Sequence, residues 1–557
     1  DHAVQYDFDR FLRYDELVAW LQGVAATHPG LVSLETYGRS HEGRDLWLVT
    51  VTDQRTGAHD TKPAHWVDAN IHSVELTASV AACHLIHRLV SGHGNDDTIT
   101  RALETRTFYV VPRVNPDGAE WAMADVPTFR RSSVRPWPWR DGHQPVGHRG
   151  GDVDGDGRVL QMRVVDPHGA WMPHPDDARL MVPVPAEGAP TGTATYRLMD
   201  EGTVADHDGF TVPTPRPTEG LDMNRNYPAG WGTKIPGSGD HPLSEPEIDA
   251  LVRAMIARPN ICGFNAYHTS GGVLLRPSST RADSSLDQFD VWVWKQLGER
   301  GEALTSYPVH SVYEDFTWDK SETMSGASDD WAYEHLGVFG WTTEYWDIVH
   351  AATGTKQSTH FWYTGPTDAE ALAVLRWCDE HHPDGYVDWY EFEHPQLGSV
   401  ELGGWTDLTT WTNPPAHLLR EEVTAHADFA VHQALCSPRI EIVHERVTAL
   451  GDDAWRVDVG VANTGWLPTQ VSALAAKENL VLPLAVEVTG GAVIDGPARR
   501  EFGQLDGRSA LRFRNGHDGT PDRVLATFVV SAPAGTQLTA TAAHPRAGRA
   551  TITITLE

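Results

Sequence analysis

Cysteine is scarce in this sequence, and long apolar runs are missing from it. The four cysteines among 557 residues are Cys83, Cys262, Cys378 and Cys436, and no two of them form a C-x-x-C pair. This spacing argues against a zinc site built from thiolates. No stretch approaches the roughly 20 consecutive apolar residues of a transmembrane helix. We therefore expect no membrane span.

Basic residues are also few, with 44 Lys and Arg against 76 Asp and Glu, which gives a formal net charge of −32. Such a charge repels the nucleic-acid backbone and anionic lipid, so neither is an expected partner. Two explanations of the acidity stay open: an ordinary soluble surface and bound cations.

The first residues, Asp1-His2-Ala3, include neither the basic region nor the apolar region of a signal peptide. The apolar content of 40%, with 21 Trp, is ample for a large buried core and excludes a disordered chain. The length predicts either three to four domains or one large α/β domain with an attachment.

Strand-like and helix-like segments alternate along much of the chain. Apolar residues at helical spacing predict helices over 14–28, 76–90, 244–257, 286–303, 367–381 and 418–434, and buried strands are predicted at 46–51, 65–69, 108–114, 261–267 and 338–343. This alternation is typical of an α/β domain with a parallel or mixed sheet.

Three other regions depart from that rhythm. Residues 131–219 are rich in Pro, Gly, Asp and Trp, and 383–412 is a connector rich in Trp and Pro. We interpret 131–219 as a functional or separately organised insertion. After Pro438, strict alternation and frequent turn signals predict a small β-sandwich. The expected fold class is an α/β mixed-sheet domain over 1–435 and a β-sandwich over 436–557.

Chemistry-bearing residues follow two of the predicted strands. His72 and Glu75 lie three residues apart where a strand ends and a helix begins, so both side chains can reach one metal ion. His268 follows the strand at 261–267, at the edge where open α/β sheets hold their sites. Two His and one Glu, with a fourth position left to water, are a catalytic zinc set.

At this point the sequence resembles the zinc carboxypeptidases related to carboxypeptidases A and B. Seven landmarks follow in family order, together with a match at 325–331: His72-x-x-Glu75, Asn115-Pro116-Asp117-Gly118, Phe129-Arg130-Arg131, Leu221 to Asn226, Ser244-Glu245-Pro246-Glu247, Tyr267-His268-Thr269 and Thr343-Glu344. The resemblance covers about residues 8–382 outside the insertion. It implies a peptide or protein substrate.

The resemblance also implies a role for each matched position. His72, Glu75 and His268 would bind zinc, and Asp222 would orient His72. Glu344 would be the general base. Arg130 would stabilise the oxyanion, with Arg131 and Arg135 as close competitors, and Asn224 and Arg225 would hold the substrate's terminal carboxylate.

Two substrate-facing positions bear on specificity. Asp329 stands where members favouring Lys or Arg carry Asp, which implies a basic preference; alternatively, Asp329 or Asp330 is a structural carboxylate. Glu322 stands where the family has the Tyr that closes over substrate. It would repel a substrate carboxylate, so either Tyr313 or Trp318 substitutes for that Tyr or the substrate is not a plain peptide C-terminus.

Within the insertion, Asp152, Asp154 and Asp156 alternate and Gly157 follows at the sixth position, as in the first half of an EF-hand loop. The twelfth position is Arg163 instead of Glu. We expect an incomplete loop that binds calcium, with Asp166 or backbone oxygens completing the ligands; a plain acidic turn is the alternative.

Three functions stay open. The first is a carboxypeptidase that releases C-terminal residues. The second is a zinc amidase or endopeptidase acting on another amide, such as a cell-wall peptide. The third is a zinc-containing binding protein without turnover. Because the β-sandwich resembles accessory modules of secreted enzymes, we expect an extracellular protein.

Overall fold

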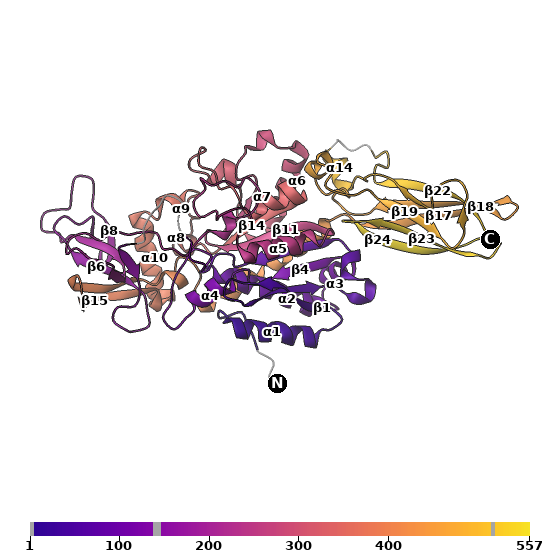
Figure 1. The fold of residues 1–557 in the computed structure, drawn as a ribbon. Helices are drawn as coiled ribbons and strands as arrows, with labels where there is room; N and C mark the ends of the chain where they lie inside the picture. The colour runs from indigo at the N-terminus through magenta and orange to yellow at the C-terminus, as the bar shows by residue number, and fades with distance from the viewer. Residues whose placement is uncertain (1–4, 138–145, 514–517) are drawn as a thin grey trace.

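A mixed sheet forms the centre of the molecule (Figure 1). The computed structural model describes residues 5–137, 146–513 and 518–557. In spatial order the strands of this sheet are β1 (Val32–Arg39), β2 (Asp45–Val51), β4 (Thr107–Val111), β3 (Ala64–Ala69), β11 (Ile261–Thr269), β14 (Phe339–Tyr345), β12 (Val273–Arg276) and β13 (Val309–Ser311). Strands β4, β3, β11 and β14 are mutually parallel, and the two ends of the sheet contain antiparallel pairs. The predicted mixed α/β class is confirmed.

The central strands are continuous apolar runs because helices and loops cover them. Every residue of β3, β4 and β14 is buried, as expected for parallel strands. The surrounding helices are α1 (Tyr14–Thr27), α2 (Leu76–Gly92), α3 (Asp97–Thr105), α4 (Pro116–Ala122), α5 (Pro246–Ile256), α6 (Gln288–Thr305), α7 (Ser328–Trp331), α11 (Leu419–Thr424) and α12 (His426–Cys436). Helices α2 and α12 pack on β3 and β11, while α5 packs on β1 and α7 on β14.

The insertion and the connector together form a second sheet, which the sequence pattern does not predict. Its order is β15 (Tyr386–His394), β16 (Gly398–Trp405), β6 (Gln161–Val165), β9 (Tyr196–Asp200), β7 (Trp171–His174) and β8 (Asp177–Pro183). A separate pair joins β5 (His148–Gly150) to β10 (Gly202–Val204). The interpretation of 383–412 as a mere connector is therefore wrong. Helices α8 (Ile348–Thr353), α9 (Phe361–Thr364) and α10 (Asp368–His381) lie beside this sheet in Figure 1.

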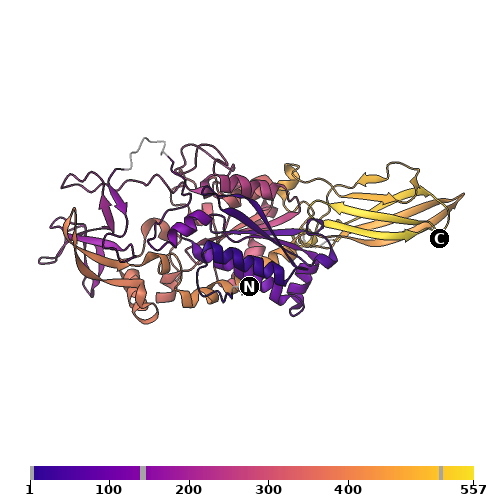
Figure 2. The same ribbon diagram turned by 60° about the horizontal axis from the view of Figure 1, so that its bottom comes forward.

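The C-terminal part contains two four-stranded antiparallel sheets, as the alternating pattern predicts. One contains β17 (Ile440–Gly451), β18 (Ala454–Asn463), β22 (Arg523–Ser531) and β20 (Ala492–Val493); the other contains β21 (Arg499–Glu501), β19 (Ala485–Thr489), β23 (Gln537–His544) and β24 (Gly548–Thr555). Inward residues such as Val457, Val486 and Phe528 form one core between them. Figure 2 shows this β-sandwich extending from one end of the central sheet. The short helices α13 (Ala473–Lys477) and α14 (Arg508–Phe513) lie in its loops.

None of the helices in the described ranges combines the length and the apolarity that a bilayer crossing requires. The four cysteines are all free thiols.

Candidate metal centre

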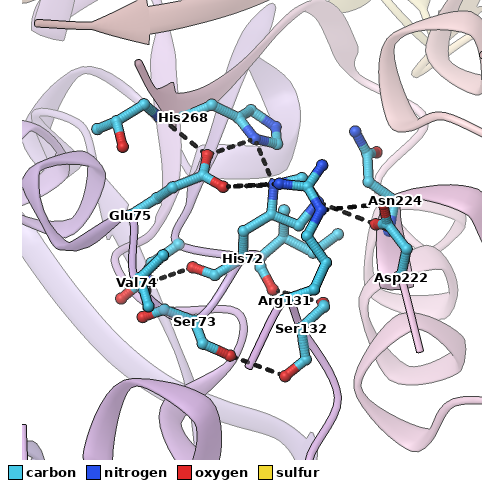
Figure 3. Close-up of polar contacts among 12 residues, drawn as sticks. His72, Ser73, Val74, Glu75, Arg131, Ser132, Asp222, Asn224 and His268 are labelled. Carbon is cyan, nitrogen blue, oxygen red and sulfur yellow. Dashed lines mark hydrogen bonds and ion pairs between the residues drawn. The ribbon is translucent and has the colours of Figure 1, made fainter. Parts of the chain in front are cut away.

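The ends of neighbouring parallel strands bring the predicted metal ligands together (Figure 3). The chain leaves β3 at Ala69, and His72 and Glu75 lie in the short loop before α2 begins at Leu76. His268 is the penultimate residue of β11 and pairs in register with Glu344 of β14. All three predicted ligands therefore lie at one edge of the sheet, together with the predicted base.

The donor atoms of His72, Glu75 and His268 converge on a single point. All three residues are at least 97% buried, and their ligand atoms lie within 4.8 Å of one another. Glu75 Oε2 lies 2.6 Å from His72 Nδ1, and Glu75 Oε1 lies 3.1 Å from His268 Nδ1. The two Nδ1 atoms are 3.2 Å apart.

This spacing fits a bound zinc ion. Two nitrogens that bind one tetrahedral zinc at about 2.0–2.1 Å stand about 3.3 Å apart. Two facing imidazole nitrogens cannot both present lone pairs to each other without a proton or a cation between them. The structure thus brings the predicted ligands together as one candidate metal site.

Two further groups hold His72 and Glu75 in place. Asp222 Oδ1 lies 2.9 Å from His72 Nε2, so Nδ1 is left to face the donor cluster. The backbone N–H of Thr269 donates to Glu75 Oε1 at 2.9 Å. Burial opposes ionisation of Glu75, but attraction to His72 and hydrogen bonds from His268 and His72 hold its pKa well below the usual value.

Glu344 is buried, and its Oε2 atom has no hydrogen-bond partner within the described residues. Burial, followed by the nearby Glu75 carboxylate, raises its pKa well above the usual value for Glu. A carboxyl with a raised pKa can both accept and return a proton near neutral pH.

The guanidinium at the cluster belongs to Arg131, whereas the sequence analysis favours Arg130. Arg131 Nη1 lies 3.4 Å from Glu75 Oε2, and its Nε donates to Asp222 Oδ2 at 3.2 Å. Arg130 instead pairs with Glu219 at 3.3 Å. Adjacent residues on an extended segment point in opposite directions, so the sequence alone cannot choose between them.

Arg135, the other competitor, also lies outside the cluster. Its Nη2 pairs with Glu245 Oε2 at 2.9 Å.

The segments predicted to contact substrate lie next to one another. Asn224 Oδ1 accepts a hydrogen bond from the N–H of Ser328, and Arg225 donates to the carbonyl of Asn224. Asp329 is buried, and its Oδ2 accepts a hydrogen bond from the Thr342 hydroxyl, two residues before Glu344.

Glu322 lies away from these contacts. It is exposed on the segment between β13 and α7, and its N–H donates a hydrogen bond to the carbonyl of Asp319.

A further carboxylate, which the spacing of the sequence motif does not indicate, lies beside the acidic loop of the insertion. Asp152, Asp154 and the buried Glu201 have ligand atoms within 4.8 Å of one another. Asp156 instead pairs with Arg158 at 2.7 Å. Glu201 lies 45 residues beyond Asp156, so no local pattern could have identified it.

Asp166, which the sequence analysis offered as a further ligand of this loop, pairs with Arg197 at 2.6 Å. It is not among the three grouped carboxylates.

Comparison with known proteins agrees with this geometry. A family model described as zinc carboxypeptidase matches residues 17–362, and one described as a domain of unknown function matches 439–555. The chain is 26% identical to carboxypeptidase B2 of Rattus norvegicus over 382 residues, which cover 66% of this chain and 69% of the relative.

Other relatives match over shorter stretches. Carboxypeptidase B of Astacus astacus is 29% identical over 171 residues, 31% of this chain and 48% of that protein. A zinc carboxypeptidase of Saccharothrix mutabilis subsp. capreolus is 30% identical over 132 residues, which span 24% of this chain and only 28% of that protein. An inactive metallocarboxypeptidase of Saccharomyces cerevisiae is 26% identical over 135 residues, 24% of this chain and 31% of that protein.

Among solved structures, thrombin activatable fibrinolysis inhibitor aligns at 18% identity and a TM-score of 0.38, covering 69% of this chain and 78% of that one. The family model spans more than half of the chain and contains the whole converging ligand set. The chain belongs to the zinc carboxypeptidase family.

Proposed function

We propose that this protein is a zinc metallocarboxypeptidase that hydrolyses peptide bonds and releases C-terminal residues. The observation that carries the proposal is the convergence of His72, Glu75 and His268 beside the buried Glu344, whose Oε2 atom has no hydrogen-bond partner among the described residues. A binding protein without turnover has no need of a buried general base at this position, although the inactive yeast relative keeps that alternative testable.

Each residue contributes a separate step. His72, Glu75 and His268 would hold a zinc ion, which would lower the pKa of a water molecule and polarise the substrate carbonyl. Glu344 accepts the proton of the attacking water and returns it to the leaving amine, since its raised pKa suits both transfers. Asp222 keeps the His72 ring oriented through Nε2.

We propose Arg131 as the oxyanion-stabilising residue in place of Arg130. Its guanidinium already contacts Glu75 and Asp222 at the edge of the ligand set. A cation beside the scissile carbonyl stabilises the negative charge that develops there during attack.

A basic side chain is the proposed preference at the released residue. Asp329 is buried near Glu344 and makes no ion pair with any described Lys or Arg. A buried carboxylate of this kind is satisfied by a cationic guest. Asn224 and Arg225, on the adjoining segment, are proposed to hold the terminal carboxylate.

One observation favours a second candidate, a zinc amidase or endopeptidase acting on a different amide. Glu322 is exposed, and its side chain forms no hydrogen bond or ion pair with the site residues among the described parts of the chain. Glu322 stands where the family has the Tyr that closes over substrate, so this position offers no phenol to a substrate C-terminus unless Tyr313 or Trp318 substitutes for it.

We also propose that Asp152, Asp154 and Glu201 bind calcium, and that the protein acts outside the cell. Three carboxylates within ligand spacing support the first. The extracellular location is inferred from the β-sandwich, which resembles accessory modules of secreted enzymes.

Incubation of the zinc-loaded protein with a peptide library, with products mapped by mass spectrometry, tests the function. We expect loss of single C-terminal Lys or Arg, abolished by Glu344→Gln with zinc still bound and unaffected by the surface control Glu299→Gln. Asp329→Ile should remove the basic preference while hydrolysis persists. Undiminished turnover in Glu344→Gln would overturn the mechanism; internal cuts would favour the second candidate.

A further inference from the structure

A second concave site lies far from the metal centre, where the central part meets the β-sandwich. A cavity of about 670 Å³ is bordered by the ends of α2 and α3, by α6 and α12, and by Trp466 and Arg508 from the C-terminal part. Helix α2 begins beside Glu75, and Arg88 lies twelve residues beyond Leu76 along it. At 1.5 Å per residue this places Arg88 about 18 Å along the helix from the metal centre.

The cavity is strongly cationic for so acidic a protein. Four of its bordering residues are arginines, Arg88, Arg101, Arg300 and Arg508, although the chain has only 44 basic residues and a net charge of −32. Four guanidinium groups around one hollow repel each other unless anions compensate them.

The cavity's own carboxylates compensate only one of these arginines. Asp96 and Asp428 both pair with Arg88, at 2.8 and 3.3 Å. Within residues 5–137, 146–513 and 518–557, Arg101 and Arg300 form no ion pair. The exposed Arg101 and Arg300 side chains therefore border the cavity without a paired carboxylate among the described residues.

The inner wall does not supply the missing negative charge either. His432 and Cys436 lie on α12 with Nε2 and Sγ 3.6 Å apart. Burial, followed by the nearby Arg300, lowers the pKa of His432 to about 4, and burial raises the pKa of Cys436 to about 12. Both groups are neutral at neutral pH, so the wall offers hydrogen bonds without charge.

We propose that this cavity is an anion-binding site for a phosphate group, held by Arg101 and Arg300 with Arg508 and the His432 ring at its sides. Guanidinium groups bind phosphate oxygens bidentately, which suits a site built from arginines without lysine. The phosphate can come from free inorganic phosphate or from a phosphodiester polymer, and both present the same oxygens.

Isothermal titration of the zinc-loaded full chain tests the proposal, with inorganic phosphate and dimethyl phosphate as separate probes. We expect phosphate to bind, and Arg101→Gln/Arg300→Gln to weaken binding at least about tenfold, because hydrogen bonds to charged groups are lost. Arg376→Gln, an exposed arginine on α10, is the matched control and should bind as the wild type does.

The probes and variants separate the outcomes. Binding of dimethyl phosphate as well points to a phosphodiester polymer, and binding of inorganic phosphate alone points to the free ion; both support the site. Equal affinity of the double variant and the wild type, or no binding at millimolar phosphate, would overturn it. Peptide hydrolysis is not the readout, so failure here leaves the proposed peptidase activity untouched.

Discussion

Arg130 and Arg131 are neighbours in sequence but have different surroundings, and that difference predicts different kinetic effects. We expect Arg131→Ala to lower kcat by about 10²–10³-fold, as for the loss of one oxyanion donor. Arg130→Ala should change kcat less than about tenfold, because Arg130 pairs with Glu219 and the carbonyl of Phe129 instead of the ligand set. Steady-state kinetics on one peptide checks both, and the reverse ranking would return the role to Arg130.

Glu247 predicts a pH dependence of stability that is separate from catalysis. It is buried in the first turn of α5, where Oε1 accepts a hydrogen bond from the His41 N–H and Oε2 has no partner among the described residues. Burial raises its pKa to about 7, above the unfolded value of 4.5. Above that unfolded value the unfolded chain has lost a proton that the folded chain retains, so this residue destabilises the fold as pH rises from 4.5 to about 7.

Glu247→Gln should remove that penalty. We expect the variant to match the wild type near about pH 4 and to be more stable by up to about 3 kcal/mol near about pH 8. Urea unfolding at the two pH values measures the difference, with the exposed Glu187→Gln as control. A stability gain that does not change with pH would contradict the assignment.

At the scale of elements, the central sheet and its site follow from local sequence signals. Strands such as β3 and β14 are uninterrupted apolar runs, and His72, His268 and Glu344 lie at or beyond their ends. The order of strands in the sheet brings these three residues together, and the resemblance to the family implies that order. Local patterns therefore predict this part well.

The second sheet could not be predicted in the same way. Its strands β6, β7 and β9 are short and half-exposed, and β6 pairs with β16 through Arg163 and Glu401, 238 residues apart. Short strands whose partners are so distant show no clear period, and only tertiary pairing defines them. The positions of Arg131 beside Glu75 and of Glu201 beside Asp152 could not be predicted for the same reason. Both depend on contacts between segments that are distant in sequence.

The loop containing Asp152 predicts a local effect of calcium. Asp152 and Asp154 lie close to Glu201, the residue that directly follows β9. Calcium binding only to the folded protein should raise the Tm of the wild type by mass action. Asp152→Asn/Asp154→Asn should abolish that rise in thermal unfolding with and without calcium. Asp208→Asn, in a similar acidic turn outside the group, is the control; a calcium-dependent rise that persists in the double variant would exclude this loop as the site.

At the scale of the whole molecule, the β-sandwich is joined to the central part by a continuous buried interface. Leu467 and Val471 belong to the same apolar core as the central sheet. Arg546 donates to the carbonyls of Leu336 and Gly337, which precede β14. Because β14 carries Glu344, the C-terminal sheets support the strand that holds the proposed base.

Asp290 on α6 is the residue whose removal tests this coupling. It is fully buried, and its carboxylate accepts hydrogen bonds from the Tyr333 hydroxyl and from the N–H groups of Ala473 and Leu474 at the start of α13. Asp290→Ala leaves the buried Tyr333 hydroxyl and the two partly buried N–H groups without this acceptor, which costs about 3 kcal/mol. We expect the variant to unfold several degrees below the wild type, with peptidase activity and tryptophan fluorescence lost in one shared transition, while the exposed Glu299→Ala unfolds as the wild type does. The contrary result would be two separate unfolding transitions in the wild type, with Asp290→Ala lowering only the transition in which activity is retained. That result would show that the β-sandwich unfolds independently and that β14 does not depend on the β-sandwich for support.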